Sequence, residues 1–214
     1  MKVIKVQYKS PEWYELRTKG IGGSDAASAL GMNPWRSNIE LWEEKVGIRT
    51  VADISNARME YGTKAEEHIT ALFDLDHPEY EVKEYKDVVF VNEFMFASID
   101  GGLIEKATGR QGGLEVKTTE PRTKATWDQW DNQVPQYYYI QVLHYLAVTG
   151  WDFWILKCRF KSRDFQGNLI ITEKEYRFER EECKSDIEYL IQQESKFWKS
   201  VVNKIRPGRI LPMI

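Results

Sequence analysis

The stretch ASIDGGLIEKATGRQGGLEVKTT, residues 97–119, contains two apolar segments separated by a glycine-rich turn. Leu103–Lys106 and Gly113–Thr118 both read as β-strands, and the turn Thr108-Gly109-Arg110-Gln111-Gly112 lies between them. The stretch therefore predicts two neighbouring strands that can pair as a hairpin.

Two acidic residues and one lysine stand out in these apolar strands. Asp100 ends the first apolar segment, and a single valine separates Glu115 from Lys117 in the second. Because residues i and i+2 of a strand face the same side, Glu115 and Lys117 point together, and a hairpin brings Asp100 beside Glu115. Charged side chains that emerge from otherwise buried strands usually have a functional reason.

These residue types suit a divalent cation. Two adjacent carboxylates form an oxygen site for Mg²⁺ or Mn²⁺, and the backbone carbonyl of Val116 can add a third oxygen. Such an ion would lower the pKa of a bound water and stabilise charge on a scissile phosphate. Lys117 would orient or deprotonate that water, or contact the phosphate. The competing interpretation is structural, since Asp-Gly is a common turn pair and Glu-x-Lys a common exposed strand pair.

A further acid lies on a long helix predicted over Ala57–Leu75. Glu66 ends the segment Gly62-Thr63-Lys64-Ala65-Glu66 and would reach the metal site or hold a second ion. A solvated helix position is the alternative, because Glu67 beside it has the same chemistry.

The rest of the chain predicts an α/β fold. Apolar spacing and capping residues predict further helices at Pro11–Lys19, Asp25–Leu30 (N-cap Ser24), Ile39–Val46 (N-cap Asn38), Tyr137–Val148 and Glu181–Asn203. Alternation predicts further strands at Asp87–Val91, Glu93–Ile99, Phe153–Arg159 and Leu169–Phe178. We expect a single domain over residues 1–214, with an N-terminal helical segment and a central mixed β-sheet flanked by helices.

Composition restricts the classes of protein to consider. The 214 residues are 42% hydrophobic and 13% aromatic, which is enough for a real core. The net charge of −3 argues mildly against a protein that simply coats nucleic acid. The sequence contains neither the apolar run of a membrane span nor a secretory signal, and Cys158 and Cys183 lack CxxC spacing. We expect a cytoplasmic protein without structural zinc or a membrane partner.

Six segments in order resemble the phage-lambda-type exonucleases, also described as YqaJ-like viral recombinases, in the PD-(D/E)xK nuclease superfamily. The segments are RTKGIGGSD (17–25), GMNPW with IELWEEKVG (31–47), MEYGTKAEE (59–67), ASIDGG (97–102), GLEVKTT (113–119) and YYYIQVLHYLAVTG (137–150). Each segment is a weak signal, but six in order are specific. The chain departs from the family pattern at Ile99, where proline is usual, and at Thr118-Thr119-Glu120, which precede Pro121.

The resemblance implies a role for each matching residue. Asp100 and Glu115 would be metal ligands, Lys117 the catalytic lysine and Glu66 an additional acid near the metal. Gln141 would lie beside the active centre. Arg17 and Ser24 would receive the 5′-phosphate of the digested strand. A phosphate there also makes physical sense, because two glycines precede Ser24 at a helix start and arginine binds phosphate with two hydrogen bonds.

The resemblance also implies an activity. Such enzymes are Mg²⁺-dependent 5′→3′ exonucleases that digest one strand of double-stranded DNA from its ends and leave 3′ overhangs for phage-type recombination. A homotrimeric ring and a single-strand annealing partner are further family expectations. Two alternatives stay open, an endonuclease of the same superfamily and a non-catalytic module that binds DNA ends. A glycosidase that uses Glu66 and Glu115 is a remote one, because Lys117 would have no role there.

Three residues after the catalytic strand have two interpretations. Arg122, Trp127 and Trp130 either line a path for DNA, by stacking on bases or contacting phosphates, or belong to the core or an interface. With eight tryptophans in the chain, packing is favoured for most of them. The two cysteines are expected to be buried packing residues.

Overall fold

A five-stranded sheet and a four-stranded sheet organise the molecule, whose computed structural model describes residues 1–50 and 56–211. The larger sheet has the strand order β3-β6-β7-β8-β9, and only the β7–β8 pair is parallel. Its strands are β3 (Tyr80–Lys83), β6 (Gly101–Glu105), β7 (Gln111–Thr119), β8 (Phe153–Arg163) and β9 (Leu169–Glu179). The predicted hairpin is confirmed, because β6 pairs antiparallel with β7.

The second sheet corrects the prediction of one central sheet. Its strand order is β1-β4-β5-β2, built from β1 (Lys2–Lys5), β2 (Ile21–Gly22), β4 (Val88–Asn92) and β5 (Met95–Ala97). The strands predicted at residues 87–91 and 93–99 are present, but they pair with the N-terminal segment instead of extending the β6–β7 hairpin. The α/β class is confirmed, with two mixed sheets in place of one.

Seven helices complete the described part of the chain. They are α1 (Pro11–Thr18), α2 (Gly23–Ala29), α3 (Asn38–Lys45), α4 (Ala57–Asp76), α5 (Lys124–Asp128), α6 (Gln136–Thr149) and α7 (Lys184–Val202). All six predicted helices are present within a few residues, and α5 is the one that was not predicted. Among the described residues, no helix combines the length and hydropathy needed to span a bilayer.

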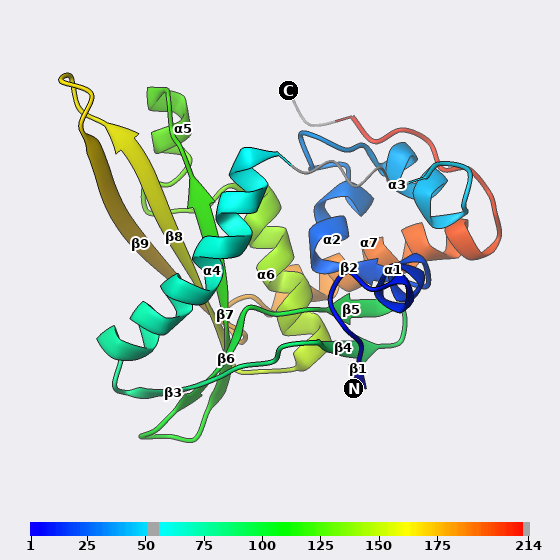
Figure 1. Cartoon of the computed structure of the whole chain (residues 1–214). Coiled ribbons are helices and arrows are strands. Elements are labelled where there is room, and N and C mark those ends of the chain that lie inside the picture. Colours follow the sequence, from blue (N-terminus) through cyan, green and yellow to red (C-terminus); the bar gives the residue numbers. More distant parts are fainter. Residues whose placement is uncertain (51–55, 212–214) are drawn as a thin grey trace.

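Two helices lie on opposite faces of the larger sheet (Figure 1). Ile69 and Phe73 of α4 pack on one face, against Leu114 and Val116 of β7. The other face is covered by α6, which also packs against α2, α7 and the smaller sheet. Because α6 is surrounded by other elements, nine of its residues are buried.

Glycine in β7 allows an unusually close approach of aromatic rings from β8. A Cβ atom added to Gly113 would lie 2.3 Å from the ring of Trp154, and one added to Gly112 would lie 2.3 Å from the ring of Phe153. Both rings are fully buried. The glycines before Glu115 thus let two large side chains fill the core directly beside β7.

Candidate active site and phosphate pocket

The β6–β7 hairpin brings together the three residues predicted to carry the chemistry. Pairing of the two strands stops at Gly101 and Leu114, so Asp100 lies just before the first residue of β6. There Asp100 Oδ2 accepts a hydrogen bond of 2.7 Å from the backbone N–H of Val116. Lys117 donates a short hydrogen bond to Glu115 Oε1, in line with the expectation that these side chains share a face.

Helix α6 supplies two further polar groups to the same point. The side-chain amide of Gln141 donates to Glu115 Oε1 and to the hydroxyl of Tyr145, each at 2.7 Å. Gln141 was predicted to lie beside the active centre, and the structure places its side chain in contact with Glu115. Tyr145 was not predicted as a site residue, although it follows Gln141 by one helical turn, and that spacing could have identified it.

Glu66 approaches from the opposite side of the sheet. It lies on α4, which covers the face that Val116 occupies, and its carboxyl group interacts with that of Asp100. Its neighbour Glu67 is exposed, whereas Glu66 is half-buried. The structure therefore separates two adjacent acids that have the same chemistry, and it places the one selected by the family resemblance beside Asp100.

The pKa values of this cluster are strongly perturbed. Burial raises the pKa of Asp100 to about 7, helped by the charge of Glu66, and burial together with the charge of Asp100 raises the pKa of Glu115 to about 7. For Lys117, burial acts to lower the pKa, but attraction to Glu115 outweighs it and the pKa is raised. Acids held close together in an apolar setting are typical of a site that is completed by a cation.

The donor set fits a hard divalent cation. Glu115 Oε2 is buried and has no hydrogen-bond partner in the described part of the chain. In a strand the N–H and C=O of one residue point to the same side, so the Val116 carbonyl faces Asp100 as its N–H does. Two carboxylates and this carbonyl would hold Mg²⁺ or Mn²⁺. Within residues 1–50 and 56–211, no group of three or more His, Cys, Asp or Glu side chains has the geometry of a metal site.

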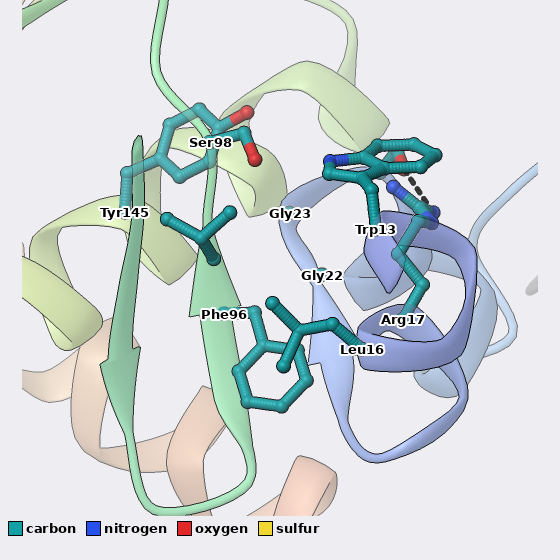
Figure 2. A pocket seen from close by; sticks show the side chains of 10 residues that line it. Trp13, Leu16, Arg17, Gly22, Gly23, Phe96, Ser98 and Tyr145 are labelled. Carbon is teal, nitrogen blue, oxygen red and sulfur yellow. Dashed lines mark hydrogen bonds between the residues drawn. The ribbon is translucent and has the colours of Figure 1, made fainter. Parts of the chain in front are cut away.

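The residues predicted to bind a 5′-phosphate also meet. Arg17 Nη2 donates to Ser24 Oγ at 3.1 Å, and both residues line a pocket of about 60 Å³. Figure 2 shows Arg17 and Trp13 of α1 on one side of this pocket and Tyr145 on the other, across Gly22 and Gly23. The Arg17 guanidinium lies 4.9 Å from the centroid of the Trp13 ring, which holds it in place.

Ser24 is not the N-cap of its helix. The cap is Gly22, whose backbone N–H donates to Asp25 Oδ2 at 3.1 Å, and Ser24 is the second residue of α2. The side chain of Ser24 is therefore free of capping and available to a ligand. The predicted cap Asn38 is also corrected, since Ser37 accepts from the N–H of Glu40 in a capping box.

Asp25 is a site residue that sequence reasoning missed. Its buried carboxylate forms ion pairs of 3.2 Å with Arg17, 2.6 Å with Arg36 and 2.7 Å with Lys45. Burial acts to raise the pKa of Asp25, but these three cations outweigh it and hold the pKa well below its usual range. Arg36 also pairs with Glu44 at 2.9 Å, so three cations and two acids leave one positive charge in excess behind the pocket. The adjacency of Asp25 to Ser24 was the available signal, but its partners are 8 to 20 residues away in sequence.

Tyr145 connects the pocket with the carboxylate cluster. A Cβ atom on Gly23 would lie 2.5 Å from the Tyr145 ring, so only glycine permits this contact. The hydroxyl of Tyr145 then accepts from Gln141, which donates to Glu115. The two predicted sites are therefore neighbours along one face of α6.

The sequence allowed two interpretations for Arg122, Trp127 and Trp130, and the structure divides these residues between core and surface. Trp130 is buried and packs on Phe160 and Tyr176, and the half-buried Trp127 stacks on Phe160 at 5.1 Å. Arg122 is exposed. Both cysteines are buried and free, as predicted.

Comparison with known proteins identifies the family. A family model for the YqaJ-like viral recombinase domain matches residues 12–152. The chain belongs to this family. One curated relative, the uncharacterized protein YqaJ of Bacillus subtilis (strain 168), is 33% identical over 141 residues. That match covers 65% of this chain and 42% of YqaJ, so the chain spans less than half of the relative's length.

Solved structures show the fold of this YqaJ-like chain. The alkaline exonuclease LHK-Exo from Laribacter hongkongensis, also solved with dAMP, has a TM-score of 0.60 and 22% identity, covering 92% of this chain and 94% of that one. A phage-related exonuclease from Haemophilus somnus 129PT has a TM-score of 0.55 and 13% identity, covering 90% and 99%. The YqaJ-like chain therefore has the fold of phage-type exonucleases.

Proposed function

We propose that this protein is a metal-dependent 5′→3′ exonuclease that digests one strand of double-stranded DNA from its ends and leaves 3′ single-stranded overhangs for phage-type recombination. The observation that carries the proposal is the connection of the Arg17–Ser24 pocket to the Asp100–Glu115–Lys117 cluster through Tyr145 and Gln141. A nuclease that starts from ends needs both parts, whereas an endonuclease does not need a pocket for a terminal phosphate.

The pocket would bind the terminal 5′-phosphate. Arg17 and Ser24 would donate hydrogen bonds to its oxygens, and the excess positive charge around Asp25 would favour its negative charge. Gly22 and Gly23, at the start of α2, line the pocket beside Ser24. Binding there positions the following phosphodiester toward Gln141 and Glu115.

The carboxylate cluster would hold Mg²⁺ through Asp100, Glu115 and the carbonyl of Val116, with Glu66 beside it. A bound Mg²⁺ would neutralise charge on the scissile phosphate and make water a stronger acid. Gln141 and Tyr145 orient the carboxylate of Glu115. Attraction to Glu115 and Asp100 raises the pKa of Lys117, and a cation held by those carboxylates would weaken that attraction. Lys117 would contact the phosphate, or orient or deprotonate the attacking water.

Two family expectations extend the proposal to the assembly. We propose a homotrimer that surrounds the duplex and a partner that anneals the single strands produced. An enclosing ring would also account for a net charge of −3, because the acidic residues can face outward while cations line the channel.

The test uses linear duplex DNA with a 5′-phosphate or a 5′-hydroxyl end, beside covalently closed circular DNA, in Mg²⁺ and in chelator. Loss of the linear duplex only with Mg²⁺, faster with the 5′-phosphate, is the expected result, and a label at the 3′ end of each strand should remain on long single strands. Cleavage of the circle would replace the proposal with an endonuclease. Binding of ends without any cleavage would replace it with a non-catalytic module.

A further inference from the structure

Beyond the carboxylate cluster, one acid at the end of the catalytic strand faces three cations. Glu120 lies 3.8 Å from Arg58, 4.0 Å from Arg122 and 3.4 Å from Lys161, measured between charged atoms. We name these four residues the Glu120 patch. One negative charge does not balance three positive charges, so the patch is electropositive in a chain whose net charge is −3.

The neighbouring charges on the same face of the sheet are balanced. Arg159 and Lys157 of β8 pair with Glu173 and Glu175 of β9, two cations with two acids. Lys161 follows Arg159 by two residues and thus points to the same face. Along β8, positive charge is therefore in excess at Lys161, within the patch, and not at Lys157 and Arg159.

The cations of the patch are available to another anion. The side chains of Arg58 and Arg122 are 63% and 75% exposed, and their distances from Glu120 are at the outer limit of an ion pair. Such exposed, loose pairs contribute little to stability. Lys161 is held more firmly, because its ammonium lies 3.8 Å from the centroid of the Tyr61 ring.

Two elements connect the patch to the carboxylate cluster. On α4, Arg58, Gly62 and Glu66 follow each other at intervals of four residues and share one face, which places Arg58 about 12 Å from Glu66. On β7, Glu120 follows Lys117 by three residues, about 10 Å along the strand. Both estimates therefore place the patch about 10 to 12 Å from the proposed cleavage site.

We propose that the Glu120 patch binds backbone phosphates of the duplex about three nucleotides from the bond that is cleaved. Each strand of B-DNA advances about 3.4 Å per nucleotide along the axis, so 10 to 12 Å corresponds to about three steps. The inference rests on the proposed function for its substrate. It assigns the duplex contact to residues outside both the carboxylate cluster and the phosphate pocket.

The first test measures binding of blunt duplex DNA against salt concentration, in chelator so that the DNA stays intact. Each phosphate contact contributes about 0.9 to the slope of log affinity against log salt. Combining Arg58→Gln, Arg122→Gln and Lys161→Gln should lower the slope by two to three. Between 50 and 200 mM salt, the parent should then lose up to about 40-fold more affinity than the triple variant.

The matched control is Arg159→Gln. Arg159 and Lys161 lie on one strand with side chains 25% and 24% exposed, but Arg159 has its own partner in Glu173. Arg159→Gln should leave the slope unchanged, and Glu120→Gln should strengthen binding by removing the negative charge of the patch. A triple variant with the parent's affinity and slope would overturn the inference.

A second test locates the phosphate. Single uncharged methylphosphonate linkages are placed along each strand, one position at a time. One position about three nucleotides from the cleaved bond should weaken binding by the parent as much as Lys161→Gln does, with no further loss when the two changes are combined. Fully additive losses at every position would contradict the contact. If the parent protein neither binds nor cuts duplex ends, the proposed function is overturned together with this inference. If the parent cuts normally and the patch variants bind DNA as the parent does, only this inference is overturned.

Discussion

Lys117 lies between a carboxylate and an aromatic ring. It donates to Glu115, and its ammonium is 5.2 Å from the centroid of the Tyr138 ring. Both neighbours favour the charged form, and the raised pKa follows from the attraction to Glu115 once the cost of burial is overcome. The side chain is therefore suited to stabilise negative charge.

Replacing Lys117 with alanine should abolish most cleavage. We expect a loss of about 10²- to 10⁴-fold in the rate of duplex digestion, the range for a positioned group that acts in the transition state. Binding of DNA ends should remain near the parent level. Rates measured in Mg²⁺ test this, with the exposed Lys83→Ala as the control. Parental digestion by the Lys117 variant would remove the whole active-site assignment.

At pH values at which its carboxyl group is charged, Asp100 should lower the stability of the folded protein. Its pKa is about 7 in the folded protein, against about 3.9 for an unfolded chain. The folded state thus binds more protons between these values, and its stability falls as pH rises from about 4 to about 7. In chelator at pH 8, Asp100→Asn should therefore raise the melting temperature, and the gain should shrink toward pH 4. A gain that does not change with pH would contradict the raised pKa.

At the scale of elements, Asp25 ties α2 to three other segments. Its ion pairs reach Arg17 in α1, Arg36 in the loop before α3, and Lys45 at the end of α3. The carboxylate is 1% exposed and Lys45 is 6% exposed. Removing one partner of a buried pair leaves the others desolvated and uncompensated, which is costly.

Asp25→Asn should destabilise the protein by about 3 to 5 kcal/mol. Because the pKa of Asp25 is lowered in the folded state, its stabilising contribution is present above the unfolded value and is lost only as pH falls through the lower folded value. Chemical denaturation at pH 7 measures the cost. Glu15→Gln, which breaks the exposed pair with Lys19, is the control and should change stability by less than about 1 kcal/mol. Equal effects of the two variants would refute the role of Asp25.

Local patterns predicted the elements that form the candidate site. The β6–β7 hairpin, α4 and α6 all follow from apolar spacing and glycine turns, and Asp100, Glu115 and Lys117 meet as that hairpin requires. Short elements without strong patterns were missed, namely β1, β2, β3 and α5. The three strands depend on pairing partners elsewhere in the chain, such as β1 on β4, and no local signal records that. Helix α5 has a local signal in its N-cap Thr123, but it is only five residues long.

The parts of the site that the sequence could not predict also depend on contacts between residues far apart in the chain. Arg36 and Lys45 reach Asp25 only because α2 and α3 pack together, and Glu66 differs from Glu67 only through the position of α4 on the sheet. Resemblance to a known family supplied Arg17, Ser24 and Gln141, which residue chemistry alone would have left as a helix residue, a cap and a core amide.

At the scale of the whole molecule, the proposed trimer can be measured directly. Light scattering on the purified protein should give three times the chain mass of 25.2 kDa. Digestion of long duplexes should then proceed many steps per binding event, because an enclosing assembly prevents dissociation. A mass of 25.2 kDa together with strictly distributive digestion would argue for an enzyme that works as a single chain.

Helix α6 has a consequence for the length of what is released. Tyr145 lines the pocket proposed for the terminal phosphate, and Gln141 contacts the carboxylate proposed to bind the metal, one helical turn or about 5.4 Å along the helix axis. A span this short leaves room for one nucleotide unit between the held end and the bond to be cut. The helix would then fix the distance from the held end to the cleaved bond, and the products would be mononucleotides whatever the sequence of the DNA.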